Sequence, residues 1–265
     1  MDGMVMSSPG GAWMVRILRG LAGLAIVVLG TCGGPSAGGE LTAEVVRAML
    51  ASHAGPAPPD LSNQNLAGFD LSGVDFKGAD LSGANLKKAN LAGADLSGAT
   101  ISLAILRGAN LRGANLRKVK AFSTILAEAD LTDADLSAAE LICNLENAKL
   151  VGANLARILG GADMRNQSMG LMRLSLYNAD LKNANLTGAD VSRALLEFAD
   201  FQGANLTGAN LMWADAGGAY FAEADLTGSN FTMADIQSAK FFGARGVSSI
   251  IGLDRTLNRS SASFD

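Results

Sequence analysis

Aromatic residues, cysteine, histidine and proline are all scarce in this chain. Only 5% of its 265 residues are aromatic, and it holds five prolines, two cysteines and one histidine. Because His53 is the single histidine and Cys32 and Cys143 are the only cysteines, the chain cannot assemble a Cys/His metal cluster, a disulfide framework or a Ser-His-Asp triad. We therefore expect no enzyme, no metal and no cofactor.

The charge balance argues against two further classes of function. The formal net charge is -4, whereas a domain that binds nucleic acid directly is usually strongly basic. Paired carboxylates such as Asp130, Asp133 and Asp135 recur at solvent-facing positions without a pocket, which argues against a glycosidase. Direct binding to nucleic acid is not expected.

Small residues replace the missing large ones in a pattern that repeats every five residues. The phrase Ala-Asp-Leu-Ser-Gly at 79–83 returns at 94–98, and Ala-Asn-Leu-Thr-Gly stands at 204–208. An apolar residue, usually leucine, is the centre of each unit; an alanine lies two positions before it, with Asp or Asn between. A fixed short period predicts a stacked solenoid, and the regular apolar position argues against a disordered low-complexity tract.

A period of five fits neither a helix, with a period of 3.6, nor a strand, with a period of two. It fits a square coil with one pentapeptide on each side. The central leucine and the alanine would point inward, and residues twenty apart would stack at about 4.8 Å. Glycines such as Gly73 and Gly78 would relieve the backbone at the corners.

The phrase Ala-(Asp/Asn)-Leu-x-x, held from about Asp60 to Arg245, resembles the pentapeptide-repeat family. The resemblance covers roughly 70% of the chain. It implies an all-β solenoid: a right-handed four-sided (quadrilateral) β-helix of pentapeptide repeats, here at 60–246, with short flanking helices. Members of the family have been linked to topoisomerase protection through DNA mimicry and to effector roles. Some dimerise through the carboxyl-terminal end, so the resemblance also allows a homodimer.

Residues 1–39 are interpreted as a signal peptide or amino-terminal targeting segment. Arg16 and Arg19 precede a short apolar run at 21–29, and small, turn-forming residues follow. This order is typical of a signal peptide, and the run is shorter than the ~20 residues that span a bilayer. The segment predicts export to the periplasm or cell envelope, with membrane contact through this segment alone.

Three fates of this segment stay open: cleavage near Ala37, retention as an anchor, and lipid attachment at Cys32 in a lipoprotein-like box. Residues 40–59 are expected to form a short capping helix and a Pro-rich linker. Thr42 can cap the helix, and apolar residues follow at helical spacing. We expect this helix to cover the open edge of the first coil, with His53 solvated near its end.

The five-residue phase is lost after Leu141 and regained at Leu176, a whole number of fives later. Two interpretations of residues 142–175 stay open. One is a set of bulges or a small bend in a continuous rod. The other is a loop near 160–161 or 166–167 that contacts a partner, for which methionines would be suited. These methionines are Met164, Met169 and Met172.

Residues 247–265 leave the repeat and are expected to form a carboxyl-terminal cap. Val247, Ile250, Ile251 and Leu257 are spaced as one apolar face of a helix. Such a helix would cover the last coil.

Three groups of outward-facing residues are candidates for an interaction surface. Ile105 and Ile125 are twenty apart and should stack into an apolar stripe. Arg193 and Trp213 are also twenty apart, with Tyr220 nearby in sequence, and would form an exposed cation–aromatic anchor. A basic belt winds round the rod, which favours a solvated surface over an anion site. Its members are Arg107, Arg112, Arg117, Lys118 and Lys120.

Two functions fit these patterns. The first is a non-enzymatic structural or protein-interaction module with an unknown protein partner, exported to the bacterial envelope. The alternative is a DNA-mimicking, quinolone-resistance-like protein that binds a topoisomerase. Duplex DNA carries one charge per about 1.7 Å, so a mimic needs dense acidic ladders. If residues twenty apart stack, one face carries the largely acidic row Asp75, Asp95, Asn115 and Asp135, which suits a DNA mimic. The neighbouring face carries the mixed row Asp80, Thr100, Lys120 and Glu140, which does not. Balanced charge and export favour the first function.

Overall fold

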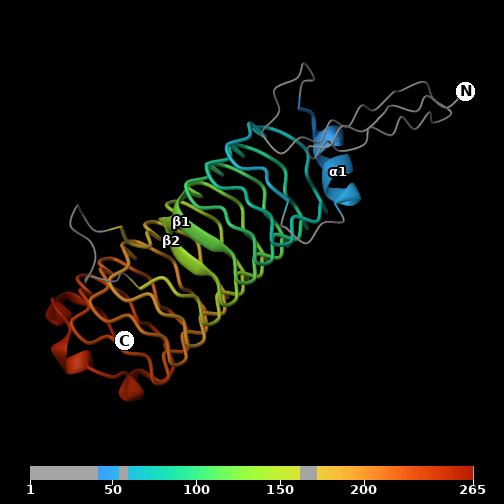
Figure 1. The fold of residues 1–265 in the computed structure, drawn as a ribbon. Helices are drawn as coiled ribbons and strands as arrows, with labels where there is room; N and C mark the ends of the chain where they lie inside the picture. The colour runs from blue at the N-terminus through green and yellow to red at the C-terminus, as the bar shows by residue number, and fades with distance from the viewer. Residues whose placement is uncertain (1–40, 54–58, 162–171, 265) are drawn as a thin grey trace, which may run out of the picture. The chain divides into compact units, whose positions relative to one another are not determined.

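The computed structural model describes residues 41–53, 59–161 and 172–264 (Figure 1). The chain divides into two compact units, Met1–His53 and Ala54–Asp265. In the first unit α1 (Ala43–Ser52) follows the N-cap Thr42, whose hydroxyl accepts a hydrogen bond from the Val45 N–H at 3.4 Å. The expected helix and its cap are present, and its place over the first coil stays a prediction. The targeting segment and Cys32 lie outside the described residues.

Four columns of stacked residues define the second unit. They begin at Asp60, Asn65, Asp70 and Asp75, and each is named here by its first residue. Within a column a residue pairs in parallel with its counterpart in the next coil, which in the regular coils lies twenty positions on, as Asp95 does from Asp75. Successive coils are joined by backbone hydrogen bonds between these positions. The stack of coils in Figure 1 is the solenoid that the period predicts.

The interior of each coil holds the two residues that the repeat assigns to it. Leu81 and Ala79 are fully buried, and the same two positions are buried in nearly all of the other five-residue units. Leucine fills the centre, while alanine leaves room for the side chains that enter from the other sides. Complete burial of a leucine contributes on the order of 2 kcal/mol, so the repeated interior dominates the stability of the stack.

Each corner is a tight turn that needs a left-handed residue. The Val74 N–H donates to the Leu71 carbonyl at 3.3 Å, and Gly73 between them has φ 64°. A positive φ at the third residue is the requirement of a type II turn, and glycine meets it without strain. The glycines at the corners therefore have the role that the sequence predicts.

The Asp or Asn of each unit holds the turn that follows it. The Ser72 N–H donates to Asp70 Oδ1 at 3.1 Å, and Asn90 Nδ2 of the next coil donates to the same oxygen at 2.9 Å. A short acceptor side chain that binds the backbone two residues on stabilises a turn. These residues are thus part of the scaffold, a role that their solvent-facing position alone does not reveal.

The loss of phase begins between two parallel strands, β1 (Lys120–Ile125) and β2 (Glu140–Asn144). Lys120 pairs with Glu140, but Ile125 pairs with Asn144, so this side of the coil is one residue shorter. Thr124 takes the alanine position and is buried; its hydroxyl donates to the Ile101 carbonyl at 2.8 Å. The first loss of phase is therefore a one-residue irregularity in the pairing of β1 with β2, and the stack of coils continues through it.

The second loss of phase adds residues. Leu159 pairs with Asp190, while Asn144 pairs with Ser175, so Leu159 and Ser175 are consecutive column positions although sixteen residues apart. Gly160 still donates to the Asp190 carbonyl at 2.8 Å. The coils thus continue on both sides of an insertion between 161 and 172. The predicted loop at 166–167, with Met164 and Met169, lies outside the described residues.

The carboxyl-terminal residues continue the coil and do not form the expected apolar helix. Three 3₁₀-helices, η1 (Val247–Ser249), η2 (Leu253–Arg255) and η3 (Arg259–Ser261), alternate with the column residues Ile251, Leu257 and Ser263. Each follows a left-handed residue, with φ from 57° to 72°. The prediction of one helical face was wrong because the period of this coil is six: Ile250 points inward and Ile251 is exposed.

Four phenylalanines close this end of the core. Phe201, Phe221, Phe241 and Phe264 stack with ring centroids 5.0, 5.0 and 4.6 Å apart. Their planes are within 12° of parallel, because coils one strand spacing apart place the rings in register. Phe264, from the last coil, covers the end of the stack.

Candidate interaction surface

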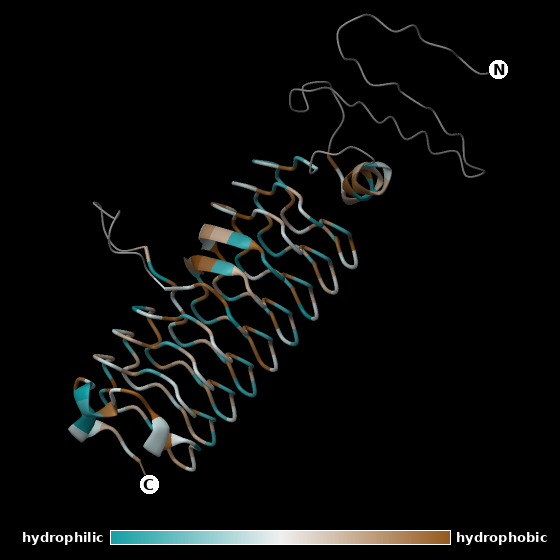
Figure 2. Cartoon of the chain, turned by 60° about the horizontal axis from the view of Figure 1, so that its bottom comes forward, coloured by the Kyte–Doolittle hydropathy of each residue, from teal (hydrophilic) through white to brown (hydrophobic). Residues whose placement is uncertain are grey.

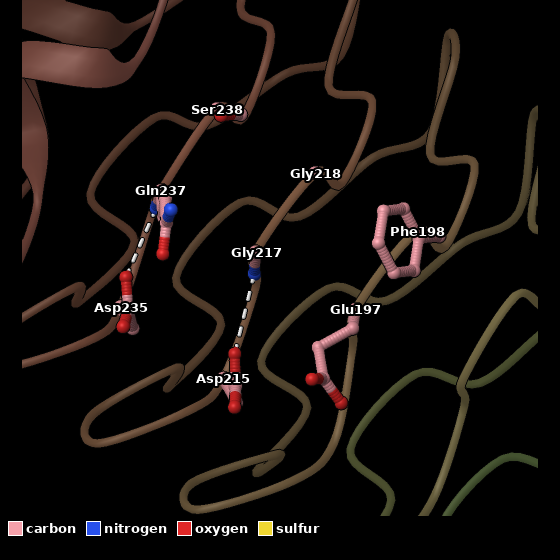
Figure 3. Close-up of a pocket in the computed structure, with 8 residues that line it drawn as sticks. All are labelled: Glu197, Phe198, Asp215, Gly217, Gly218, Asp235, Gln237 and Ser238. Carbon is pink, nitrogen blue, oxygen red and sulfur yellow. Dashed lines mark hydrogen bonds between the residues drawn. The ribbon is translucent and has the colours of Figure 1, made fainter.

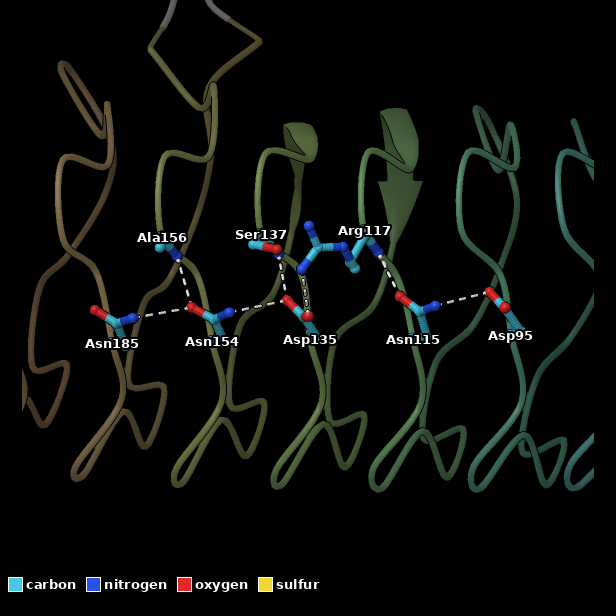
Figure 4. A network of polar contacts seen from close by, with 8 residues as sticks. All are labelled: Asp95, Asn115, Arg117, Asp135, Ser137, Asn154, Ala156 and Asn185. Carbon is cyan, nitrogen blue, oxygen red and sulfur yellow. Dashed lines mark hydrogen bonds and ion pairs between the residues drawn. The ribbon is translucent and has the colours of Figure 1, made fainter.

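The Asp75 column is a polar ladder whose members bind one another (Figure 4). Asn115 Nδ2 donates to Asp95 Oδ1 at 3.0 Å, and Asn154 Nδ2 donates to Asp135 Oδ1 at 3.0 Å. Arg117 pairs with Asp135 at 3.1 Å. The predicted stacking of this column is confirmed, but amides and an arginine interrupt its carboxylates. The column does not present the dense acidic row that a DNA mimic needs.

The three arginines of the basic belt are paired with acids of the next coil. Arg112 contacts Asp130 at 3.4 Å, Arg117 contacts Asp135 as described, and Arg107 forms an ion pair with Glu128. All three arginine side chains are about half exposed. Their charges are compensated within the chain, so these three arginines do not form a free anion site.

The Ile105–Ile125 stripe lies within a larger apolar patch. The two isoleucines pair in the Asn65 column, as predicted, and both are exposed. Leu103 lies on the turn just before Ile105 and is 63% exposed, and Phe122 lies in β1 before Ile125 and is 50% exposed. The Leu103 N–H donates to the Phe122 carbonyl at 2.8 Å, which holds these two segments together.

Further along the same side Arg193 lies over Trp213, with 5.4 Å from the guanidinium carbon to the ring centroid. This pair occupies the turns between the Asp60 and Asn65 columns, here called the 60/65 edge, which also carry Leu103 and Phe122. The predicted Arg193–Trp213 stack is therefore present. Tyr220 belongs to the Asp70 column, where Lys240 lies 6.0 Å from its ring. Proximity in sequence did not bring it to Trp213, because a corner separates them.

Several of these exposed residues occupy left-handed turn positions. Leu103, Phe198 and Trp213 have φ between 58° and 62°, where glycine stands in many other units. A bulky residue there is strained by about 1–2 kcal/mol. Strain that the fold does not require points to a function for the side chain. For Leu103 and Phe198 the signal was present in the sequence, as large residues in the glycine position, but the predicted surface did not include them. It also did not include Phe122, which lies one residue before the glycine position of its unit.

Most of the exposed large hydrophobic residues of the coil stack lie on one side, called here the apolar side; Leu159, Phe242 and Ile251 lie outside it. The apolar side consists of the Asn65 column, the 60/65 edge, and the turns between the Asn65 and Asp70 columns, called the 65/70 edge. In the hydropathy colouring of Figure 2, the strands β1 and β2 of this side carry both hydrophobic (brown) and hydrophilic (teal) segments. Its exposed large hydrophobic members are Leu103, Ile105, Phe122, Ile125, Met172, Tyr177, Phe198, Trp213 and Leu257.

A shallow groove of about 300 Å³ interrupts the 65/70 edge (Figure 3). Gly217 and Gly218 form its floor, because two turn positions there lack side chains. Glu197 and Phe198 of the preceding coil form one wall, and Gln237 and Ser238 of the next coil form the other. The Phe198 ring covers Gly218 so closely that an added Cβ would lie 2.7 Å from it. The groove was not predicted, although Gly217 breaks the repeat visibly.

A family model for pentapeptide repeats matches eight copies at residues 60–91, 84–120, 175–212 and 209–245. HetL from the cyanobacterium Nostoc, a pentapeptide-repeat protein involved in the regulation of heterocyst differentiation, is 30% identical. The match covers 84% of this chain and 95% of HetL, with a TM-score of 0.35. The chain belongs to the pentapeptide-repeat family.

Other pentapeptide-repeat structures resemble the chain less completely. One from the thylakoid lumen of Arabidopsis thaliana is 31% identical over 60% of this chain and 77% of that one, with a TM-score of 0.24. QnrB1, a plasmid-mediated fluoroquinolone resistance protein, is 19% identical over 76% and 94%, with a TM-score of 0.35. No curated protein matches the chain. The family model and these structures describe no enzyme.

Within the described part of this pentapeptide-repeat protein, no three His, Cys, Asp or Glu residues are placed to hold a metal ion. Cys143 lies inside the shortened side of the coil, and its burial raises the pKa of the thiol to about 12. The nucleophilic thiolate is therefore absent near neutral pH. No helix of the described residues is long and apolar enough to cross a bilayer.

The Asp70 column makes the stability of this pentapeptide-repeat protein depend on pH. Partial burial acts to raise the pKa of Asp130. Hydrogen bonds from the Thr132 hydroxyl at 2.6 Å and from the Thr132 backbone N–H at 3.1 Å, together with the interaction with Arg112, lower the pKa by more. The pKa of Asp130 therefore lies below its ordinary value of 3.8. Ionised Asp130 stabilises the fold fully above that ordinary value, and this stabilisation is lost as pH falls through the lower folded pKa.

We expect Asp130→Asn to lower the thermal midpoint at pH 6 and to lose less stability than the unmodified chain between pH 5 and pH 2. The two melting curves should converge at the acid end, because both then lack the charge. The pH dependence of the stability of Arg112→Gln, which removes the ion pair alone, should lie between those of Asp130→Asn and the unmodified chain. Parallel pH profiles for all three proteins would contradict the role given to Asp130.

Proposed function

We propose that this chain is a non-enzymatic protein-interaction module whose contact surface is the apolar side. The observation that carries the proposal is the exposure of bulky residues in strained turns on that side. At the turn position of Leu103, the two preceding coils hold Asn63 and Gly83, which suit a positive φ better. Folding gains little from an exposed leucine there, whereas a partner would bury it.

The composition of the patch agrees with an interface. Leu103, Ile105, Phe122 and Ile125 lie on adjacent coils and would form a compact apolar centre. Exposed aromatic residues and arginine, as in the Arg193–Trp213 pair, are enriched at the energetic centres of interfaces. The inward residues hold these side chains on a rigid ladder, so little conformational entropy is lost on binding.

Photocrosslinking tests this function directly. With p-benzoylphenylalanine at position 122, we expect discrete crosslinked species in cells, because the patch contacts its partner. Ile125→Ser in the same chain should remove them. A matched control places the crosslinker at Lys118, an exposed turn residue on another edge of the same coil region. Equal crosslinking at 118 and 122, or crosslinking that ignores Ile125→Ser, would contradict the proposal.

We further propose that the chain is exported to the periplasm or cell envelope. The support is the order of charge, apolar run and small residues within 1–39. Fused to residues 1–40, an alkaline phosphatase that needs disulfides should be active in cells, because disulfides form outside the cytosol. The same fusion with Arg16 and Arg19 replaced by glutamate is the control. An inactive fusion would contradict export.

The right-handed sense of the coil and a homodimer are proposals that rest on the family resemblance. The exposed Ile251 and Leu257 of the last coil suit a contact between two copies. The DNA-mimicking alternative receives no support from the Asp75 column, whose carboxylates Asp95 and Asp135 bind amides and Arg117. We therefore do not assign a topoisomerase as the partner.

A further inference from the structure

Three carboxylates border the groove on the 65/70 edge. Glu197, Asp215 and Asp235 come from three successive coils, and all three line the groove (Figure 3). Burial raises the pKa of Glu197, and the charges of Asp215 and Asp235 raise it further, against an opposing effect of Arg173. The groove therefore concentrates negative charge beside an apolar wall.

At several other acidic sites of the repeat, a cation of the chain contacts the carboxylate directly. Lys182, for example, contacts Asp200 at 2.7 Å and Asp180 at 3.3 Å. Within residues 59–161 and 172–264, the three groove carboxylates form no ion pair. Asp215 accepts a hydrogen bond from the Gly217 N–H at 3.4 Å, and Asp235 accepts bonds from the Gln237 N–H at 3.0 Å and from Asn258. None of these contacts is with a cation, and Arg173 acts on Glu197 only as a nearby charge without an ion pair.

The wall of the groove is aromatic. Phe198 lies in a left-handed turn, is 57% exposed and covers Gly218. Tyr177 meets its ring edge-on at a centroid distance of 5.7 Å. The ring is thus held in place by Gly218 and Tyr177, and Phe198 still exposes more than half of its surface to a partner.

We propose that this groove binds an arginine side chain of the partner polypeptide. A guanidinium can stack on an aromatic face while its N–H groups donate to carboxylates in a fork. The groove offers both elements, and the floor at Gly217 leaves room for a long side chain to lie along the edge. This inference rests on the proposed interaction function and specifies the chemistry of the partner. The groove and the apolar patch then form two parts of one docking surface, which would select an apolar segment that carries an arginine.

A titration with a minimal probe tests the groove without the natural partner. The probe is the peptide Ac-Gly-Arg-Gly-NH₂, added to the full chain, with the amide resonances of Gly217 and Gly218 followed by nuclear magnetic resonance. We expect saturable shifts centred on these glycines. The citrulline peptide, which has the same shape without charge, should bind at least about tenfold more weakly, as loss of a charged hydrogen-bonding partner predicts.

Two variants and a control complete the test. Glu197→Gln and Asp215→Asn should each weaken binding severalfold or more, and the side-chain amide oxygen introduced by Asp215→Asn can still accept the turn bond from the Gly217 N–H. Asp75→Asn removes the same charge at the same repeat position in another column and should leave binding unchanged. Absence of shifts at Gly217 and Gly218, equal binding of the citrulline peptide, or equal effects of Asp75→Asn and Asp215→Asn would overturn the proposal.

The result is separable from the proposed function. If the arginine peptide fails to bind while the crosslink at position 122 forms, the arginine proposal is wrong and the interaction module stands. If the peptide binds and the crosslink is absent, the groove is a binding site and the apolar patch is not part of it. If both fail, neither proposal holds.

Discussion

Each coil must return its backbone to the register of the coil before it, because the N–H and C=O groups of one coil bind those of the next. That requirement fixes the number of residues in a turn of the solenoid and the conformation at every corner. It also fixes the interior, where one large and one small residue enter from each side. Polar side chains such as Asp70 then hold the turns by binding the backbone two residues on. The stack therefore needs no large core and few aromatic residues.

The same constraint decides which positions are free to acquire a function. Inward positions are occupied by the fold, and substitutions there act on stability. The outward turn positions need only a left-handed backbone, for which glycine or asparagine suffices. Leu103, Phe198 and Trp213 occupy such positions at a cost in strain. Their concentration on one side of the stack, beside the groove at Gly217, is the basis for assigning that side to a partner.

Much of this architecture could be predicted from the sequence, because the rules of the repeat are local. The buried leucines and alanines, the glycines at corners and the pairing of Ile105 with Ile125 all follow from counting in fives. The last coil could not be predicted in this way, since its period becomes six and its turns become 3₁₀-helices. Tyr220, named as a candidate because it is near Trp213 in sequence, lies in another column, because a corner separates the two residues. The candidate surface was predicted only in part, because the sequence does not reveal whether a charge is compensated by the next coil, as Arg107 is by Glu128. Nor does it reveal that a missing side chain at Gly217 opens a groove beneath a phenylalanine.

The central claim is that the interior carries the fold while the apolar side is reserved for contact. Chemical unfolding of Leu103→Gly tests it most directly, with Leu106→Ala as the interior control on the same coil. The account predicts that Leu103→Gly leaves the free energy of unfolding unchanged or raises it, because glycine relieves a positive φ. Leu106→Ala should lower it by about 2–5 kcal/mol. A loss of stability in Leu103→Gly comparable to that of Leu106→Ala would contradict the account.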